Sequence, residues 1–137
     1  MKNTQKKEYI RVYGLASEIF EESLIPFLPK ILAQITKRLK DGNNEIHLAY
    51  AEALGSIVHN VMNNLTDFDE IDNVMDMIFT MIFTNLNQPA RNTQAASANC
   101  LTKVIQNTPL DPLLHKLPTI CQSVLDTFAS SVFKAHT

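Results

Sequence analysis

The chain has 137 residues, of which 45% are hydrophobic and 19% are charged. This length fits one domain with a sizeable buried core. Twelve Lys and Arg residues stand against 14 Asp and Glu residues, for a formal net charge of -2. This balance argues against a general nucleic-acid binder, because such a protein needs a surplus of positive charge.

Cysteine usage and hydropathy favour a soluble, intracellular protein. Cys100 and Cys121 are too few for a disulfide framework, and their apolar helical contexts are typical of small core residues. A signal peptide needs an apolar segment close to its N-terminus, but residues 1–8 are rich in charged side chains. We therefore expect no signal peptide. The most apolar stretch, 74–83, is short and contains Asp76, so we expect no membrane-spanning helix and no membrane partner.

Helical periodicity recurs along the chain, while strand signals are weak. The first predicted helix spans about 4–20 and the second about 25–40. Two prolines stand in the first turn of the second helix, where a missing N–H is tolerated. The apolar residues of the first helix are Ile10, Tyr13, Leu15 and Ile19. In the second helix Ile31, Leu32, Ile35 and Leu39 form a stripe that we expect to be buried.

Four more helical patterns follow, separated by turns that are rich in Gly, Asn and Pro. The turn at 41–44 ends the second helix, because Gly and Asn accept the left-handed backbone. The last residues, 132–137, have the pattern of the opening of a seventh helix. The four predicted helices span about 45–62, 68–86, 90–107 and 113–129.

An internal repeat underlies this series of helices. Residues 39–41 align with residues 86–88, 47 positions later, and the same shift matches small and apolar residues further on. The matched pairs are Ala49 with Ala96, Ala53 with Cys100, Leu54 with Leu101, and Ile57 with Val104. This is the period of HEAT repeats, in which stacked antiparallel helix pairs bury one another's apolar faces. We therefore expect an all-α HEAT-repeat solenoid of about six helices, a single domain over 1–137.

The segment from Leu39 to Ile57 resembles the HEAT consensus. It contains Leu39-Lys40-Asp41, then Ile46-His47, Ala49, Ala53-Leu54-Gly55 and Ile57. In the family, the Asp caps the second helix and pairs with an Arg of the next helix. His47 stands at the position of that Arg here, and Gln94 stands there in the following repeat. We expect His47 to be a surface or capping residue.

A narrower resemblance rests on segments that occur in a fixed order. They are Leu28-Pro29-Lys30-Ile31-Leu32 with Lys37-Arg38-Leu39-Lys40-Asp41, then Gln94-Ala95-Ala96 with Cys100-Leu101, then Val132-Phe133-Lys134-Ala135. Over residues 10–136 the chain resembles the HEAT domain of tortifolia/spiral-type microtubule-associated proteins, relatives of the TOG arrays. The resemblance implies binding to tubulin or microtubules through the turns inside each helix pair. Such domains have more repeats, which implies that this chain is a fragment of a longer solenoid.

Charge is expected to divide between the two edges of the solenoid. The turns inside the pairs share one edge, where cations gather, joined by Lys2, Lys6 and Lys7 if the first helix is the second member of its pair. A basic edge would steer an acidic partner such as tubulin, and the polar turn residues could donate hydrogen bonds to it. Each feature also has an explanation without a partner. Cations at helix ends can compensate the helix dipole, and Asn residues suit tight turns. The predicted partner-binding residues are Lys37, Arg38, Lys40, Asn43, Asn44, Asn87, Arg91 and Lys134.

The other edge, at the turns between pairs, is expected to be acidic. Its residues are Glu18, Glu21, Glu22, Asp67, Asp69, Glu70, Asp72 and Asp111, with Lys116 as the exception.

The functional hypotheses divide between binding and scaffolding. The chain has no G-x-S-x-G, H-E-x-x-H, C-x-x-C or P-loop motif and no helical His pair, so we expect no enzyme, cofactor or metal site. The leading hypothesis is a non-catalytic module that engages tubulin or microtubules in the cytoplasm, at the cytoskeleton or the cilium. The alternative is a HEAT scaffold segment within a larger assembly, without tubulin contact. An exposed solenoid end could also support a homodimer.

Overall fold

The computed structural model describes residues 3–40 and 43–129. The predicted seventh helix and Lys134 lie outside the described residues. Within them the chain forms six α-helices and one short 3₁₀ helix, with no strand, which confirms the all-α prediction. The elements are α1 (Asn3–Phe20), η1 (Glu21–Phe27), α2 (Leu28–Arg38), α3 (Asn44–Met62), α4 (Phe68–Leu86), α5 (Arg91–Asn107) and α6 (Leu110–Ala129).

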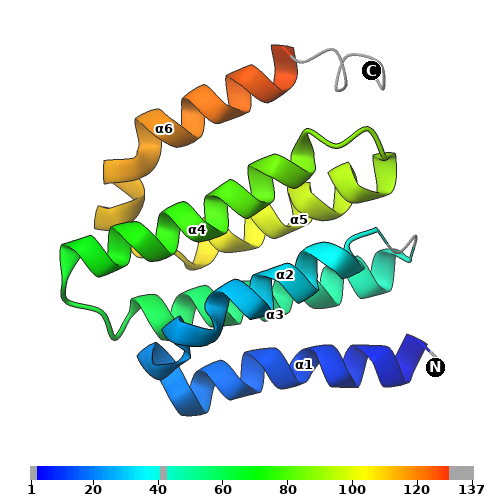
Figure 1. The fold of residues 1–137 in the computed structure, drawn as a ribbon, viewed down its shortest axis with the longest axis horizontal. Helices are drawn as coiled ribbons and strands as arrows, with labels where there is room; N and C mark the ends of the chain where they lie inside the picture. The colour runs from blue at the N-terminus through cyan, green and yellow to red at the C-terminus, as the bar shows by residue number, and fades with distance from the viewer. Residues whose placement is uncertain (1–2, 41–42, 130–137) are drawn as a thin grey trace.

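The helices form two layers in a short HEAT-like array (Figure 1). In one layer, α3 packs against α1 on one side and against α5 on the other. The second layer holds α2, α4 and α6, in which α4 contacts both neighbours and also packs on α5. Successive helices from α2 to α6 therefore alternate between the two layers, and this alternation corresponds to the repeat predicted from the sequence. Its matched positions Ala53, Cys100, Ile57 and Val104 are all buried.

The start of the second helix differs from the prediction. The segment with Pro26 is a 3₁₀ helix that ends at Phe27, and α2 begins only at Leu28 with Pro29 in its first turn. Glu21 follows α1 with a φ of 50°, which lies in the left-handed region and redirects the chain. A proline inside this segment removes a backbone donor, so regular α-helix is not favoured before residue 28.

Small residues allow α3 to approach both neighbours of its layer. A Cβ atom on Gly14 of α1 would lie 3.4 Å from the Cβ atom of Ser56. A Cβ atom on Gly55 would lie 2.8 Å from Nδ2 of Asn107, on α5. A Cβ atom at Gly55 would therefore require the Asn107 side chain to move, whereas a Cβ atom at Gly14 would make an ordinary contact.

The structure corrects two predictions of burial, for Cys121 and His47. The apolar residues Leu15 and Ile19 of α1 are exposed, with Ile19 at 73%. Helix α1 stands at the end of its layer, so α3 covers only one of its faces. Cys121 is exposed because it lies on α6 at the opposite end of the array, whereas Cys100 is buried as predicted. His47 was expected at the surface but is only 1% exposed, because it lies on the enclosed helix α3.

Candidate protein-binding surfaces

One edge of the array collects the ends of several helices. The turns from α2 to α3 and from α4 to α5 lie on the same side as the N-terminus of α1 (Figure 1). We call this side the turn edge. It consists of the last residues of α2 and α4 and the first residues of α3 and α5.

Three predicted binding residues lie together at the end of α2. Lys37 and Arg38 occupy its last turn and Lys40 follows, and all three side chains are exposed. Leu39 between them is fully buried, and its N–H donates to the carbonyl oxygens of Ile35 (3.0 Å) and Thr36 (3.3 Å). A buried anchor therefore holds a short run of exposed cations. Their place at a helix C-terminus also complements the helix dipole.

The asparagines at the start of α3 differ in what they do. Oδ1 of Asn43 accepts hydrogen bonds from the backbone N–H groups of Glu45 (2.9 Å) and Ile46 (3.3 Å). Asn43 is thus the N-cap of α3 and satisfies backbone donors that have no partner within the helix. Asn44 is the first residue of the helix and is exposed. The oxygen of Asn43 serves the fold, while Asn44 faces solvent.

The second turn carries the other two described residues of the predicted site. Asn87 is exposed, and its Nδ2 donates to the carbonyl oxygen of Phe83 at 2.9 Å. Arg91 is exposed at the first position of α5. Gln94 is buried, and its Nε2 donates to the carbonyl oxygen of Gln88 at 2.8 Å. Gln94, at the HEAT Arg position, therefore holds the turn in shape.

Charge at the turn edge is predominantly positive among the described residues. The acid there, Glu45, faces Lys7 across the α1–α3 packing, with Nζ and Oε2 3.6 Å apart. Both side chains are substantially exposed, so this pair contributes little to stability. The pair does offset the carboxylate of Glu45, which stands in the first turn of α3. The edge therefore offers an exposed basic surface.

The predicted exception on the acidic edge has a structural role. Nζ of Lys116 on α6 lies 2.7 Å from a carboxylate oxygen of Asp72 and 2.7 Å from one of Asp76, both on α4. These hydrogen bonds raise the pKa of Lys116. The ring of Phe68 also meets the ring of His115 edge-on, with centroids 4.7 Å apart. Lys116 and His115 thus fasten the first half of α6 to α4.

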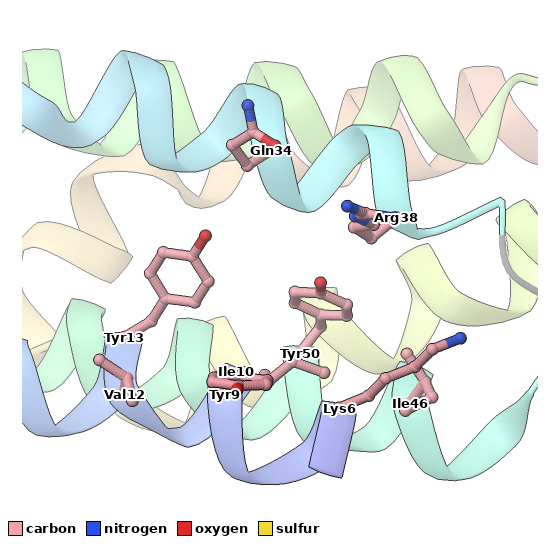
Figure 2. A pocket seen from close by; sticks show the side chains of 9 residues that line it. All are labelled: Lys6, Tyr9, Ile10, Val12, Tyr13, Gln34, Arg38, Ile46 and Tyr50. Atoms are coloured by element: carbon pink, nitrogen blue, oxygen red, sulfur yellow. The ribbon is translucent and has the colours of Figure 1, made fainter. Parts of the chain in front are cut away.

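A groove lies between α1 and α2, with α3 as its floor (Figure 2). Its volume is about 550 Å³. The sequence pattern places Tyr13 among the apolar residues of the first helix and does not bring it together with Tyr9 or Tyr50. Tyr9 and Tyr13 are one turn apart on α1, which is the signal that could have suggested a shared surface. The lining residues are Lys6, Tyr9, Ile10, Val12 and Tyr13 of α1, Gln34 and Arg38 of α2, and Ile46 and Tyr50 of α3.

Three further features of the described residues concern metal ligands, the buried thiol and hydropathy. No three or more His, Cys, Asp or Glu residues there are arranged to hold a metal ion. Burial raises the pKa of the Cys100 thiol to about 12, which keeps it protonated and unreactive at neutral pH. None of the described helices is both long and apolar enough to cross a bilayer.

Comparison with known proteins places the chain in a family. No solved structure matches it. It is similar to the proteasome adapter and scaffold protein ECM29 of Homo sapiens, with 27% identity over 117 residues, which cover 83% of this chain. The chain spans only 6% of that protein's length. The family model described as TORTIFOLIA1 N-terminal matches residues 1–137, and the chain therefore belongs to the TORTIFOLIA1 N-terminal family.

Proposed function

We propose that this domain is a non-catalytic binding module that engages tubulin or microtubules through its turn edge. The observation that carries the proposal is the exposed run of Lys37, Arg38 and Lys40, held by the buried Leu39. Membership of the TORTIFOLIA1 N-terminal family supports it, since the resemblance to tortifolia-type proteins implies a microtubule partner. Localisation of the protein at the cytoskeleton is part of the same proposal.

The mechanism is electrostatic steering followed by shape-based docking. Clustered exposed cations raise the rate at which an acidic surface is encountered, and salt weakens this effect. Each exposed charge pair is worth about 0.2–1 kcal/mol, so the affinity depends on several of them acting together. Asn44 and Arg91 extend the surface along the edge, at the starts of α3 and α5, and Asn87 follows the end of α4. Lys134 remains part of the proposed site.

The test is co-sedimentation with stabilised microtubules at low and physiological salt, beside size exclusion with free tubulin. The variant Lys37→Glu with Lys40→Glu is compared with Lys30→Glu with Arg11→Glu. Both variants replace exposed cations and change the net charge equally, but the second pair lies away from the turn edge. We expect only the first to reduce binding, by about tenfold if each charge contributes about 0.7 kcal/mol.

Equal binding by the two variants would remove the turn edge from the site. Absence of binding at both salt concentrations would favour the alternative, a HEAT scaffold segment in a larger assembly without tubulin contact. That alternative is supported by the relative ECM29, whose name describes an adapter and scaffold protein. A scaffold would bind along the helix faces, which leaves the turn-edge variants unaffected. The extent of the domain over 1–137, and its place in a longer solenoid, stay predictions.

A further inference from the structure

The two-layer array leaves one position open beside α2. Helices α2, α4 and α6 form the front layer in Figure 1, and among the described helices none of that layer lies over α1. The groove between α1 and α2 occupies this position. Its walls are helical ridges, with Lys6, Ile10 and Tyr13 along α1 and Gln34 and Arg38 one turn apart along α2. Parallel ridges of this kind accept the ridge of another helix.

The chemistry of the groove is amphipathic. Tyr9 and Val12 are exposed large side chains on α1, with Val12 at 56%. Figure 2 shows Tyr13 and Tyr50 with their hydroxyl groups directed toward α2, where Gln34 and Arg38 lie. An occupant would therefore rest apolar side chains on α1 and meet polar groups at α2. Exposed aromatic surface in a groove is typical of helix-in-groove recognition.

The charged residues that line the groove favour an occupant of one sign of charge. Of the residues that line it, Lys6 and Arg38 are cationic and none is anionic. Both belong to the end of the groove near the turn edge, because α1 begins and α2 ends there. Carboxylates follow α1 at the other end, at Glu21 and Glu22. Acidic residues of an occupant are therefore favoured only at the turn-edge end.

We propose that the groove between α1 and α2 is a second protein-binding site, which takes an amphipathic helix of a partner with acidic residues in its last turns. Its apolar face lies on Tyr9, Val12 and Tyr13, and its carboxylates reach Lys6 and Arg38. Such a helix runs in the same direction as α2, so the negative end of its dipole also meets these cations. Residues 6–13 extend over about 10 Å, so the contact is about two helical turns long. This site shares Arg38 with the proposed microtubule contact, and its other residues lie outside that contact.

The probe is a fluorescent amphipathic peptide of about 18 residues, since shorter isolated helices are marginal in water. It carries leucines along one face and glutamates in its last two turns. A second peptide has lysines in place of the glutamates. Binding of each to the whole chain is measured by fluorescence anisotropy at low and physiological salt. We expect the acidic peptide to bind at least about tenfold more tightly, because the lysine peptide repels Lys6 and Arg38.

Two matched pairs of variants locate the binding. Val12→Glu places a charge on the apolar wall, and we expect it to lower the affinity for the acidic peptide by about tenfold or more. Its control is Leu117→Glu, at a 45% exposed position on α6 at the far end of the array. Arg38→Glu is expected to weaken binding by about fivefold. Its control, Lys30→Glu, changes an exposed cation of the same helix outside the groove.

The outcomes decide the proposal in either direction. Equal affinity for the two peptides, or equal loss in Val12→Glu and Leu117→Glu, would overturn it. So would a homodimer, detected by analytical ultracentrifugation, that Val12→Glu dissociates, because the groove would then hold a second copy of the chain. The site is tested independently of the proposed function. Lys37→Glu with Lys40→Glu should keep peptide binding, and Val12→Glu should keep microtubule binding.

Discussion

Helices α3 and α1 lie side by side in the same layer, yet they differ sharply in what they bury. Helix α3 is enclosed by α1 and α5 within the layer and encloses even a histidine, His47. Helix α1 is comparably rich in large apolar residues, but Tyr9, Leu15 and Ile19 are exposed. The apolar pattern of a helix therefore does not decide its burial here. The number of helices that pack on it does, as expected for a repeat array.

Helix α6 repeats this lesson at the opposite end. Leu110, Leu114 and Leu117 follow one another at helical spacing and are all exposed. The helix is attached to α4 through Lys116 and the contact of His115 with Phe68, and it adds Ile120 to the buried core. The helices at the ends of the array are thus packed on one side, whereas α3 at its centre is packed on both. Four sets of substitutions can break or sharpen this comparison.

The largest effect is expected at the centre of the core. Ile57→Ala on α3 removes a side chain that is fully buried, and we expect the free energy of unfolding to fall by about 2–5 kcal/mol. Ile19→Ala on α1 removes an exposed side chain, and we expect less than about 0.5 kcal/mol. Urea unfolding followed by far-ultraviolet circular dichroism measures both. Similar losses would show that α1 is as enclosed as α3.

The next effect is expected where α3 meets α5. Gly55→Leu must displace Asn107, whose Nδ2 donates to the carbonyl oxygen of Lys103 at 2.8 Å. Overpacking of this kind costs about 1–3 kcal/mol. Gly14→Ala at the α1–α3 contact adds a methyl group at an ordinary distance from Ser56 and gains helix propensity, so the free energy of unfolding should rise by up to about 1 kcal/mol. Thermal unfolding measures the Tm of both variants. A larger fall in Tm for Gly14→Ala than for Gly55→Leu would contradict this prediction.

The asparagines at the start of α3 separate folding from binding. Asn43→Ala removes the N-cap, and we expect the free energy of unfolding to fall by about 1 kcal/mol. Asn44→Ala leaves the cap in place and should change stability by only a few tenths of a kcal/mol. Microtubule co-sedimentation of both variants completes the test. A loss of binding in Asn43→Ala at full stability would assign Asn43 to the binding surface instead.

The smallest effect is expected at the attachment of α6. Lys116→Met removes the ion pairs with Asp72 and Asp76, which are partly exposed, and should cost less than about 1 kcal/mol. Because the pKa of Lys116 is raised in the folded state, its contribution is present below the unfolded pKa and is lost as the pH rises through the folded value. Hydrogen exchange of α6 amides should increase in the variant, with Lys30→Met as control. Unchanged exchange would show that packing alone holds α6.

Much of the fold could be read from residue patterns, and particular helices show why. The predicted limits of α4, 68–86, match the structure, because the helix has an Asp67 cap and a strong apolar period. The prediction over 25–40 missed η1, since the same prolines suit either the first turn of an α-helix or a 3₁₀ segment. The wrong expectations for Cys121 and His47 came from judging each helix by itself.

The candidate surfaces were only partly accessible to the same reasoning. Lys37, Arg38 and Lys40 lie within four consecutive residues, so their common location followed from one helix end. The groove escaped prediction because Tyr13 and Tyr50 come from helices far apart in the chain and meet only through packing. The sequence by itself determined the helices, their repeat and the sign of charge at the turns, since these depend on local periodicity and capping. Only the tertiary structure decided which apolar faces are covered and where a groove opens, because burial depends on neighbours that no single helix encodes.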